Sequence, residues 1–321
     1  MPLSPTDHGP TRRTMLGALG ALGAVTLCGC GGHLEDDAPR LPLIPTRTVD
    51  PRASAVADEL RLVRRARAAC AALREGNLAG LSASLAALHA TQEGVLAARV
   101  RELGEDPDDR IRLPESATGT TPAPVTSLAQ GESLGLDVEG RQALSHVPGE
   151  EVALVLSVRT QRVVAAPLVG VSLAAWPDPA CATPAEAARL LAAARSTEYG
   201  LQVAAARGGA DPSPVADALR AAEETRRALE VLPGGAAASA ALGYDLPFPV
   251  PDAVAATRLA VTCLQGFSAA VIAGGPAAVG NTEALVTLLR WAALAENLAR
   301  TLGVPLQAFP GLHLSEATPP T

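Results

Sequence analysis

Histidine and glutamate are the side chains with which four-helix bundles hold pairs of metal ions, and this sequence lacks their usual spacing. A dinuclear centre of that kind takes about six side chains, including Glu-x-x-His on two of the helices. A separation of three residues puts both groups on one helical face, so that one ion can bind both. Beyond the first 30 residues the histidines are His33, His89, His146 and His313, and none has Glu three positions earlier. We therefore predict that the chain holds no dinuclear metal site.

One histidine and several scattered carboxylates are weaker candidates. His89 stands beside Gln92 and Glu93, a grouping more typical of the polar edge of a helix than of a metal ligand. Buried carboxylates without metal or hydrogen-bond partners are costly. We therefore expect the carboxylates of the C-terminal part to lie at helix surfaces or to pair with arginine, and we predict no metal or other cofactor. The alternative is a degenerate metal site built from Glu198, Glu224, Gln265 and Glu296.

The rest of the composition excludes several kinds of chemistry. All 26 basic residues are arginine, so the chain has no lysine for a Schiff base or a phosphate-binding loop. Neither Cys-x-x-Cys nor His-Glu-x-x-His occurs. The formal net charge of −7 argues against a nucleic-acid partner, which would require a basic face. Together these features favour a protein that is not an enzyme.

The N-terminus resembles two bacterial export signals. Arg12 and Arg13 precede an apolar run at 16–27 that is too short to span a bilayer, an order that resembles a twin-arginine signal. Leu27-Cys-Gly-Cys30 resembles a lipobox, in which the thiol of the last cysteine, here Cys30, receives a diacylglyceryl group before cleavage ahead of it. The resemblance implies a signal peptide at 1–29 and a lipid anchor on the outer face of the cytoplasmic membrane. An ordinary signal peptide with a chance cysteine is the alternative.

Cleavage before Cys30 would leave three cysteines in the mature chain. Cys70, Cys181 and Cys263 are an odd number, so they cannot form a complete set of intramolecular disulfides. Cys70 continues an apolar stripe of helical spacing and is expected to be a buried core thiol. That stripe comprises Val56, Leu60, Val63, Ala66, Cys70 and Leu73.

Helical patterns then fill two halves, which follow a tether at 30–49 and are separated by a proline-containing linker at 175–183. In the first half, at 50–174, helices are predicted over about 50–75, 78–103, 125–146 and 149–173. The last range is rich in β-branched residues and has a β-hairpin as its alternative. In the second half, at 184–312, helices are expected to start at or just after Thr183, Asp211, Asp252 and Asn281.

Prolines 247, 249 and 251 make the stretch from Tyr244 to Asp252 a stiff extended connector between the second and third helices of the second half. The first half has a long connection at the corresponding place. Such crossovers are typical of one group of four-helix bundles. The sequence therefore predicts an all-α fold of two tandem four-helix bundles, followed by a tail at 313–321.

Residues 184–312 resemble an actinobacterial ferritin-like domain family of unknown function. The resemblance rests on Glu198-Tyr-Gly200, Arg226-Arg227, Tyr244-Asp-Leu-Pro-Phe-Pro-Val250 and Ala308-Phe-Pro-Gly-Leu312. It implies a ferritin-like fold in an exported or membrane-anchored protein, and it implies no activity. We therefore expect a lipid-anchored, non-catalytic helical module that binds a protein partner or a small apolar ligand. The alternative from another class is a ferritin-like metalloprotein with a degenerate carboxylate site.

Overall fold

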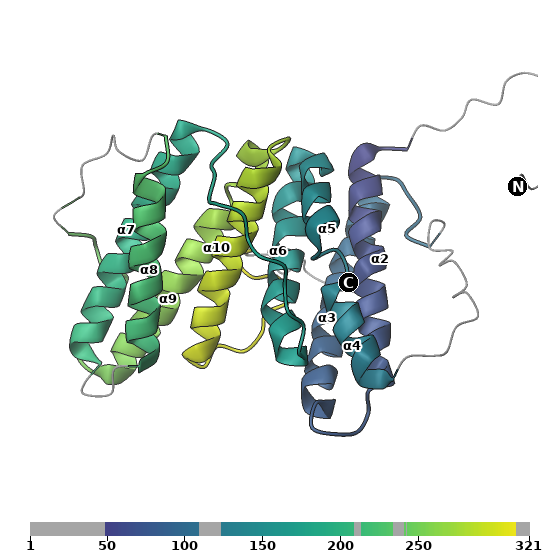
Figure 1. The fold of residues 1–321 in the computed structure, drawn as a ribbon, viewed down its shortest axis with the longest axis horizontal. Helices are drawn as coiled ribbons and strands as arrows, with labels where there is room; N and C mark the ends of the chain where they lie inside the picture. The colour runs from purple at the N-terminus through teal and green to yellow at the C-terminus, as the bar shows by residue number, and fades with distance from the viewer. Residues whose placement is uncertain (1–48, 109–122, 209–212, 234–240, 242, 313–321) are drawn as a thin grey trace, which may run out of the picture. The chain divides into compact units, whose positions relative to one another are not determined.

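A computed structural model describes residues 49–108, 123–208, 213–233, 241 and 243–312. Within these ranges the chain is helical and contains no strand, which confirms the predicted all-α class. Figure 1 shows the order of the helices along the chain. The predicted export signal with Arg12, Arg13 and Cys30, most of the tether, and the tail at 313–321 lie outside the described residues.

The first two helices form an antiparallel pair. Helix α2 (Pro51–Ala72) begins where the Asp50 carboxylate accepts a hydrogen bond from the backbone N–H of Arg52. Proline suits the first helical position because its missing N–H would be unpaired there anyway. Helix α3 (Ala79–Glu102) follows a turn in which Gly76 has a φ of +93°. The pair buries Leu60, Val63 and Leu96.

The single helix predicted over 125–146 is wrong. This stretch is divided into α4 (Pro124–Ser133), α5 (Val138–Gln142) and the 3-10 helix η1 (Ala143–His146). The break occurs where Gly135 has a φ of +69°, and Asp137 caps α5 by accepting from the N–H of Gly140. Gly131 allows α4 to lie close to α2, because a Cβ at this position would lie 2.7 Å from the Cβ of Ala69.

The stretch at 149–173 is helical, as predicted, and is not a hairpin. Helix α6 (Gly149–Ala165) continues into the 3-10 helix η2 (Ala166–Val169). From Val155 to Ala165 every residue of α6 is buried, as is typical of a helix in the middle of a core. Among the described helices, Gly149–Val169 and Ala253–Ile272 are long and apolar enough to cross a membrane by length and composition. The first of these is mostly buried inside the protein, which fits a core helix equally well.

The second half contains four long helices. They are α7 (Pro184–Arg207), α8 (Ser213–Glu230), α9 (Ala253–Ile272) and α10 (Thr282–Thr301), with the 3-10 helix η4 (Gly275–Ala278) before α10. The predicted starts of α7, α9 and α10 are confirmed, because Thr183, Asp252 and Asn281 each accept a hydrogen bond from the backbone N–H three residues ahead. The stretch at 244–252 contains neither helix nor strand. Helix α7 packs against α8 and α9, and α10 packs against both of these.

The two halves share part of their core. The described residues from 49 to 312 belong to one compact unit, and α6 packs directly against α10 (Figure 1). The largest hydrophobic cluster contains Val155 and Leu156 from α6 together with Leu285 and Leu289 from α10. The division into two tandem four-helix bundles and their ferritin-like arrangement stay predictions, and the shared core predicts that the two halves unfold together.

The linker and the C-terminal segment also join the halves. Trp176 and Cys181 of the linker pack against the shared cluster, and the N–H of Ala180 donates to Thr287 Oγ1 at 3.0 Å. At the other end, Phe309 packs into the cluster formed by α2, α3 and α6. The carbonyl of Pro310 accepts a hydrogen bond from Ser157 Oγ at 2.7 Å. Phe309 and Pro310 of the second half therefore complete the core of the first.

Candidate functional site

The core of the first half contains an unusual number of polar side chains. Charged residues are rarely fully buried unless they are paired, yet four helices direct such groups inward here. None of these residues is more than 6% exposed. We call the following residues the polar cluster: Glu59 and Cys70 from α2, His89 and Gln92 from α3, Glu132 from α4, and Arg159, Gln161 and Arg162 from α6.

Two arginines of α6 and one carboxylate form the charged side of the polar cluster. Arg159 Nε lies 2.9 Å from Glu59 Oε2, and Arg162 Nη1 lies 3.5 Å from Glu59 Oε1. Both arginines also donate to backbone carbonyls on the two sides of the break between α4 and α5. Arg162 donates to the carbonyls of Gly131 and Leu134, and Arg159 donates to the carbonyl of Gly140. Burial lowers the pKa of Arg162, and the Glu59 charge opposes this shift. The arginines therefore supply the donors that the interrupted helix needs.

A histidine, a carboxylate and a thiol meet on the other side. His89 Nε2 lies 2.6 Å from Glu132 Oε1, and Cys70 Sγ lies 3.7 Å from the same oxygen. Burial, with the Glu132 charge beside it, raises the pKa of Cys70 to about 12, so the group is a thiol at neutral pH. The expectation that Cys70 is a buried core residue is confirmed, and the expectation that His89 lies at a polar helix edge is wrong.

The orientation of His89 is fixed by its other neighbours. Gln92 Nε2 donates to the carbonyl of Ala308 at 2.7 Å and to Gln161 Oε1 at 3.1 Å. The oxygen of the Gln92 amide therefore faces His89 Nδ1, 2.9 Å away, and Nδ1 must carry a hydrogen to donate to it. The remaining nitrogen, Nε2, points at Glu132, and the 2.6 Å separation requires one proton between them.

The sequence around Glu132 also matches a pattern of hydrolytic enzymes that the sequence analysis missed. Residues 131–135 read Gly-Glu-Ser-Leu-Gly, and Gly-x-Ser-x-Gly marks a nucleophile when it joins a strand to a helix. Here Ser133 is the last residue of α4, and its hydroxyl donates to the carbonyl of Gln130 at 3.0 Å. The structural context for a nucleophile is therefore missing at Ser133.

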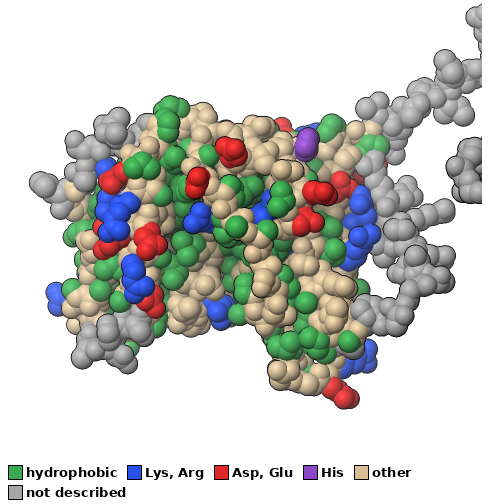
Figure 2. Space-filling model, in the orientation of Figure 1, with side chains coloured by type: hydrophobic (Ala, Val, Ile, Leu, Met, Phe, Trp, Pro, Cys, Tyr) green, Lys and Arg blue, Asp and Glu red, His purple; other side chains and the backbone are tan. Residues whose placement is uncertain are grey.

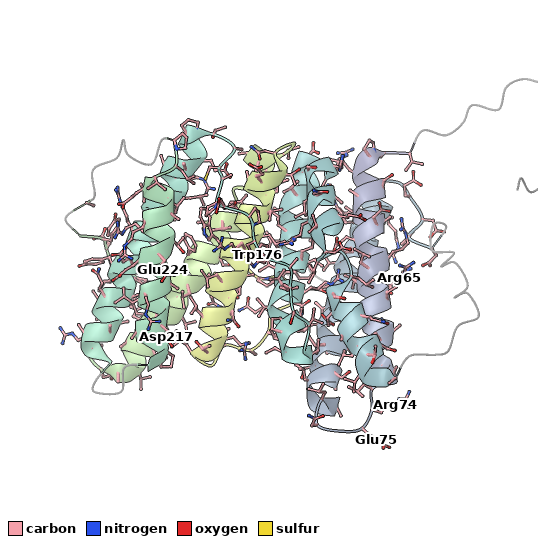
Figure 3. All side chains as sticks on the ribbon, viewed as in Figure 1. Arg65, Arg74, Glu75, Trp176, Asp217 and Glu224 are labelled. Atoms are coloured by element: carbon pink, nitrogen blue, oxygen red, sulfur yellow. The ribbon has the colours of Figure 1, made fainter. Side chains whose placement is uncertain are left out.

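The four candidate ligands of the second half are not brought together as one set. Glu198 pairs with Arg226 at 2.5 Å, as expected, and Glu224 is exposed on α8 (Figure 3). Gln265 and Glu296 line a different pocket, together with Gln307. Glu296 departs from the expectation of a surface or arginine-paired group, since it is 7% exposed and burial raises its pKa.

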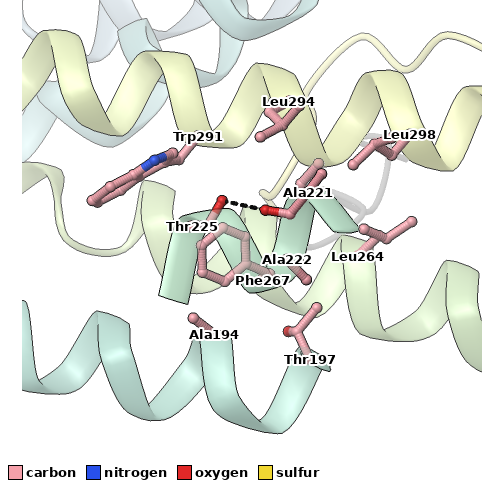
Figure 4. Close-up of a pocket in the computed structure, with 11 residues that line it drawn as sticks. Ala194, Thr197, Ala221, Ala222, Thr225, Leu264, Phe267, Trp291, Leu294 and Leu298 are labelled. Atoms are coloured by element: carbon pink, nitrogen blue, oxygen red, sulfur yellow. Dashed lines mark hydrogen bonds between the residues drawn. The ribbon is translucent and has the colours of Figure 1, made fainter. Parts of the chain in front are cut away.

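An apolar pocket lies among the four long helices of the second half (Figure 4). Its cavity volume is about 20 Å³, roughly the room for one water molecule, so a larger occupant requires the lining side chains to move. Phe267 and Trp291 form its aromatic part, and the Thr225 hydroxyl is occupied by a bond to the carbonyl of Ala221 at 2.9 Å. The Thr197 hydroxyl donates to the carbonyl of Cys263 at 3.4 Å. The rest of the lining is alanine and leucine: Ala194, Ala222, Leu264, Leu294, Ala295 and Leu298.

The described surface carries charges of both signs. On the face shown in Figure 2, acidic and basic side chains are interspersed among apolar ones. The large exposed hydrophobic residues within the described ranges are separated valines on several helices and turns: Val125, Val138, Val231, Val254 and Val279.

Comparison with models of known protein families, with functionally described proteins and with solved structures finds no match to this chain. The resemblance of residues 184–312 to a ferritin-like family therefore stays a prediction, and function has to be argued from the two interior features just described.

Proposed function

We propose that this protein is a lipid-anchored, non-catalytic helical module on the outer face of the cytoplasmic membrane, and that it binds a small apolar ligand among α7, α8, α9 and α10. The observation that supports this most directly is the apolar pocket of Figure 4. Helical bundles build ligand sites from side chains on facing helices. Here those positions carry alanine, leucine and aromatic residues, so the ligand they suit is apolar.

The lining argues for binding over catalysis. The only polar side chains among the residues that line this pocket are Thr197 and Thr225, and each donates its hydroxyl hydrogen to a backbone carbonyl. Neither general-acid nor nucleophilic chemistry has a candidate group there. Phe267 and Trp291 offer flat apolar surface to a hydrocarbon chain or ring.

The pocket can be tested through its own tryptophan. The chain has two tryptophans, and Trp176 lies in the linker, so Trp176→Phe leaves Trp291 as the single tryptophan, which is excited selectively over the two tyrosines. Titration with a series of straight-chain alcohols should change the Trp291 emission in a saturable manner, with affinity rising as the chain lengthens. No saturable change with any member of the series would overturn the proposed ligand class.

A matched pair of substitutions locates the binding. Ala221 is half-buried and lines the pocket, whereas Ala192 is exposed on α7. We expect Ala221→Leu to weaken alcohol binding at least about tenfold, because the extra methyl groups fill the space. Ala192→Leu should leave it unchanged. Equal binding by the two variants would place the ligand elsewhere.

The membrane anchor is tested separately. Cys30→Ala should release the protein from membranes or leave its precursor unprocessed, because a stable anchor requires the acyl chains attached at that thiol. Normal processing with unchanged membrane retention would rule out a lipobox at Cys30, without affecting the pocket.

A further inference from the structure

Three atoms that metals favour converge inside the first half. Cys70 Sγ, His89 Nε2 or Nδ1 and a Glu132 carboxylate oxygen lie within 4.8 Å of one another, and all three residues are buried. They come from three different helices, so only the folded protein assembles them. The second oxygen of the carboxylate, Glu132 Oε2, is buried without a hydrogen-bond partner among the described residues. A buried acceptor left unpaired in this way is costly and points to a missing ligand.

The separation of Cys70 Sγ from Glu132 Oε1 fits one small ion. Tetrahedral zinc has bonds of about 2.3 Å to sulfur and about 2.0–2.1 Å to nitrogen or oxygen, which places a sulfur and an oxygen ligand roughly 3.5 Å apart. Cys70 Sγ and Glu132 Oε1 are 3.7 Å apart. The same geometry requires roughly 3.3 Å between nitrogen and oxygen, so His89 Nε2 and Glu132 Oε1 would separate slightly from their 2.6 Å contact.

Neighbouring residues hydrogen-bond to the candidate ligands and fix their orientation, as residues behind the ligands do in known metal sites. His89 donates from Nδ1 to Gln92, which is itself tied to the carbonyl of Ala308, and this leaves Nε2 directed at the site. The Ser82 hydroxyl donates to the carbonyl of Cys70 at 2.8 Å and so steadies the helix end that carries the thiol.

The charge balance allows a dication to enter. The nearby cations Arg159 and Arg162 already have Glu59 and backbone carbonyls as partners. Binding would replace the thiol proton of Cys70 and the proton shared by His89 and Glu132. Two protons would leave to solvent as one doubly charged ion enters, so the net charge of the buried site would stay the same and the large cost of adding charge to an apolar interior would be avoided.

We propose that Cys70, His89 and Glu132 bind a single divalent transition-metal ion of the zinc type. Bonds form from the ion to Sγ, Nε2 and a carboxylate oxygen, two protons are released, and the ion keeps one water or gains one further ligand at its fourth position. This site is not the dinuclear centre whose absence the sequence predicts, and it departs from the expectation of no metal. It lies in the first half and does not depend on the apolar pocket.

Metal analysis of the full chain tests the proposal. The protein is purified from zinc-supplied cells, and dialysis against EDTA removes ions held at the surface. A second sample is unfolded with EDTA and refolded with Co²⁺. We expect roughly one ion per chain in both samples and a thiolate-to-cobalt charge-transfer absorption band in the second. Less than about a tenth of an ion in both samples would overturn the site.

Matched cysteine variants identify the ligand. Cys70→Ala should lose the cobalt band and lower the metal content about tenfold, whereas Cys263→Ala, at a half-buried thiol of α9, should retain both. Metal retained equally by the two variants would show adventitious binding only and overturn the proposal. Glu132→Gln, which preserves shape, should lose metal as Cys70→Ala does. Should either ligand variant fail to fold, the band and metal content of the unaltered chain alone decide.

Discussion

Glu296 on α10 is a residue that is only 7% exposed, and burial raises the pKa of its carboxyl group above the ordinary value of 4.5. Because the unfolded chain ionises this group more readily, its ionised form lowers stability at any pH above the raised value. As the pH falls through that raised pKa toward the ordinary one, the folded protein takes up a proton first and the penalty disappears.

We therefore expect Glu296→Gln to raise the melting temperature at pH 8, since the amide has no charge to bury. The gain should shrink to nothing at about pH 4, where the natural side chain is protonated in both states. Thermal unfolding at the two pH values measures this, with Glu224→Gln as the exposed control. A lower melting temperature for Glu296→Gln at pH 8 would show that the carboxylate makes a contact worth more than its desolvation.

For single residues, the sequence predicted the roles of those whose partners lie close along the chain. The capping roles of Thr183, Asp252 and Asn281 follow from a few adjacent letters. The contact of His89 with Glu132 spans 43 positions, and the pattern around His89 contains no sign of it. The available signal was weak: Gly131 beside Glu132 predicts a close helix contact at that point, but it does not identify the partner helix.

Helix α6 is the element that carries the most buried polarity. Arg162 is fully buried, lies beside Glu59, and donates to the carbonyls of Gly131 and Leu134 at the end of α4. Removing one member of a buried, hydrogen-bonded charge pair leaves the other charge and its acceptors without compensation.

Arg162→Met should therefore lower the free energy of unfolding by about 3–5 kcal/mol. Arg65→Met, at an exposed arginine of α2 (Figure 3), should change it by no more than about 0.5 kcal/mol. Urea denaturation of the two variants provides the comparison. If both substitutions had the same small effect, Arg162 would not be holding the break between α4 and α5.

The helices themselves were largely predictable, and the exceptions have a local physical cause. Stripe and cap signals predict α2, α3, α7, α9 and α10 within a few residues. The prediction of one helix over 125–146 was wrong because Arg159 and Arg162 of another helix, α6, stabilise a break there. Sequence spacing alone does not show that α6, a strongly apolar helix, delivers these donors.

On the scale of the whole molecule, the shared core predicts one unfolding transition. Phe309 of the second half is 8% exposed and packs among α2, α3 and α6. Phe309→Ala should cost about 3–5 kcal/mol, and hydrogen exchange should speed up in α2 and α3 as well as near the substitution. Calorimetry of the full chain should show a single transition. Two well-separated transitions, with exchange altered in the second half alone, would show that the halves fold independently.

The position of Phe309 near the end of the chain also sets an order of events during synthesis. The Gln92 amide donates to the carbonyl of a residue 216 positions later, so α2 and α3 leave the ribosome long before their last packing partner exists. Contacts of such long sequence separation form late and slowly. A nascent chain stopped before residue 308 has an open N-terminal core with an amide still lacking its acceptor. In this protein α2 and α3 are made well before they can become native.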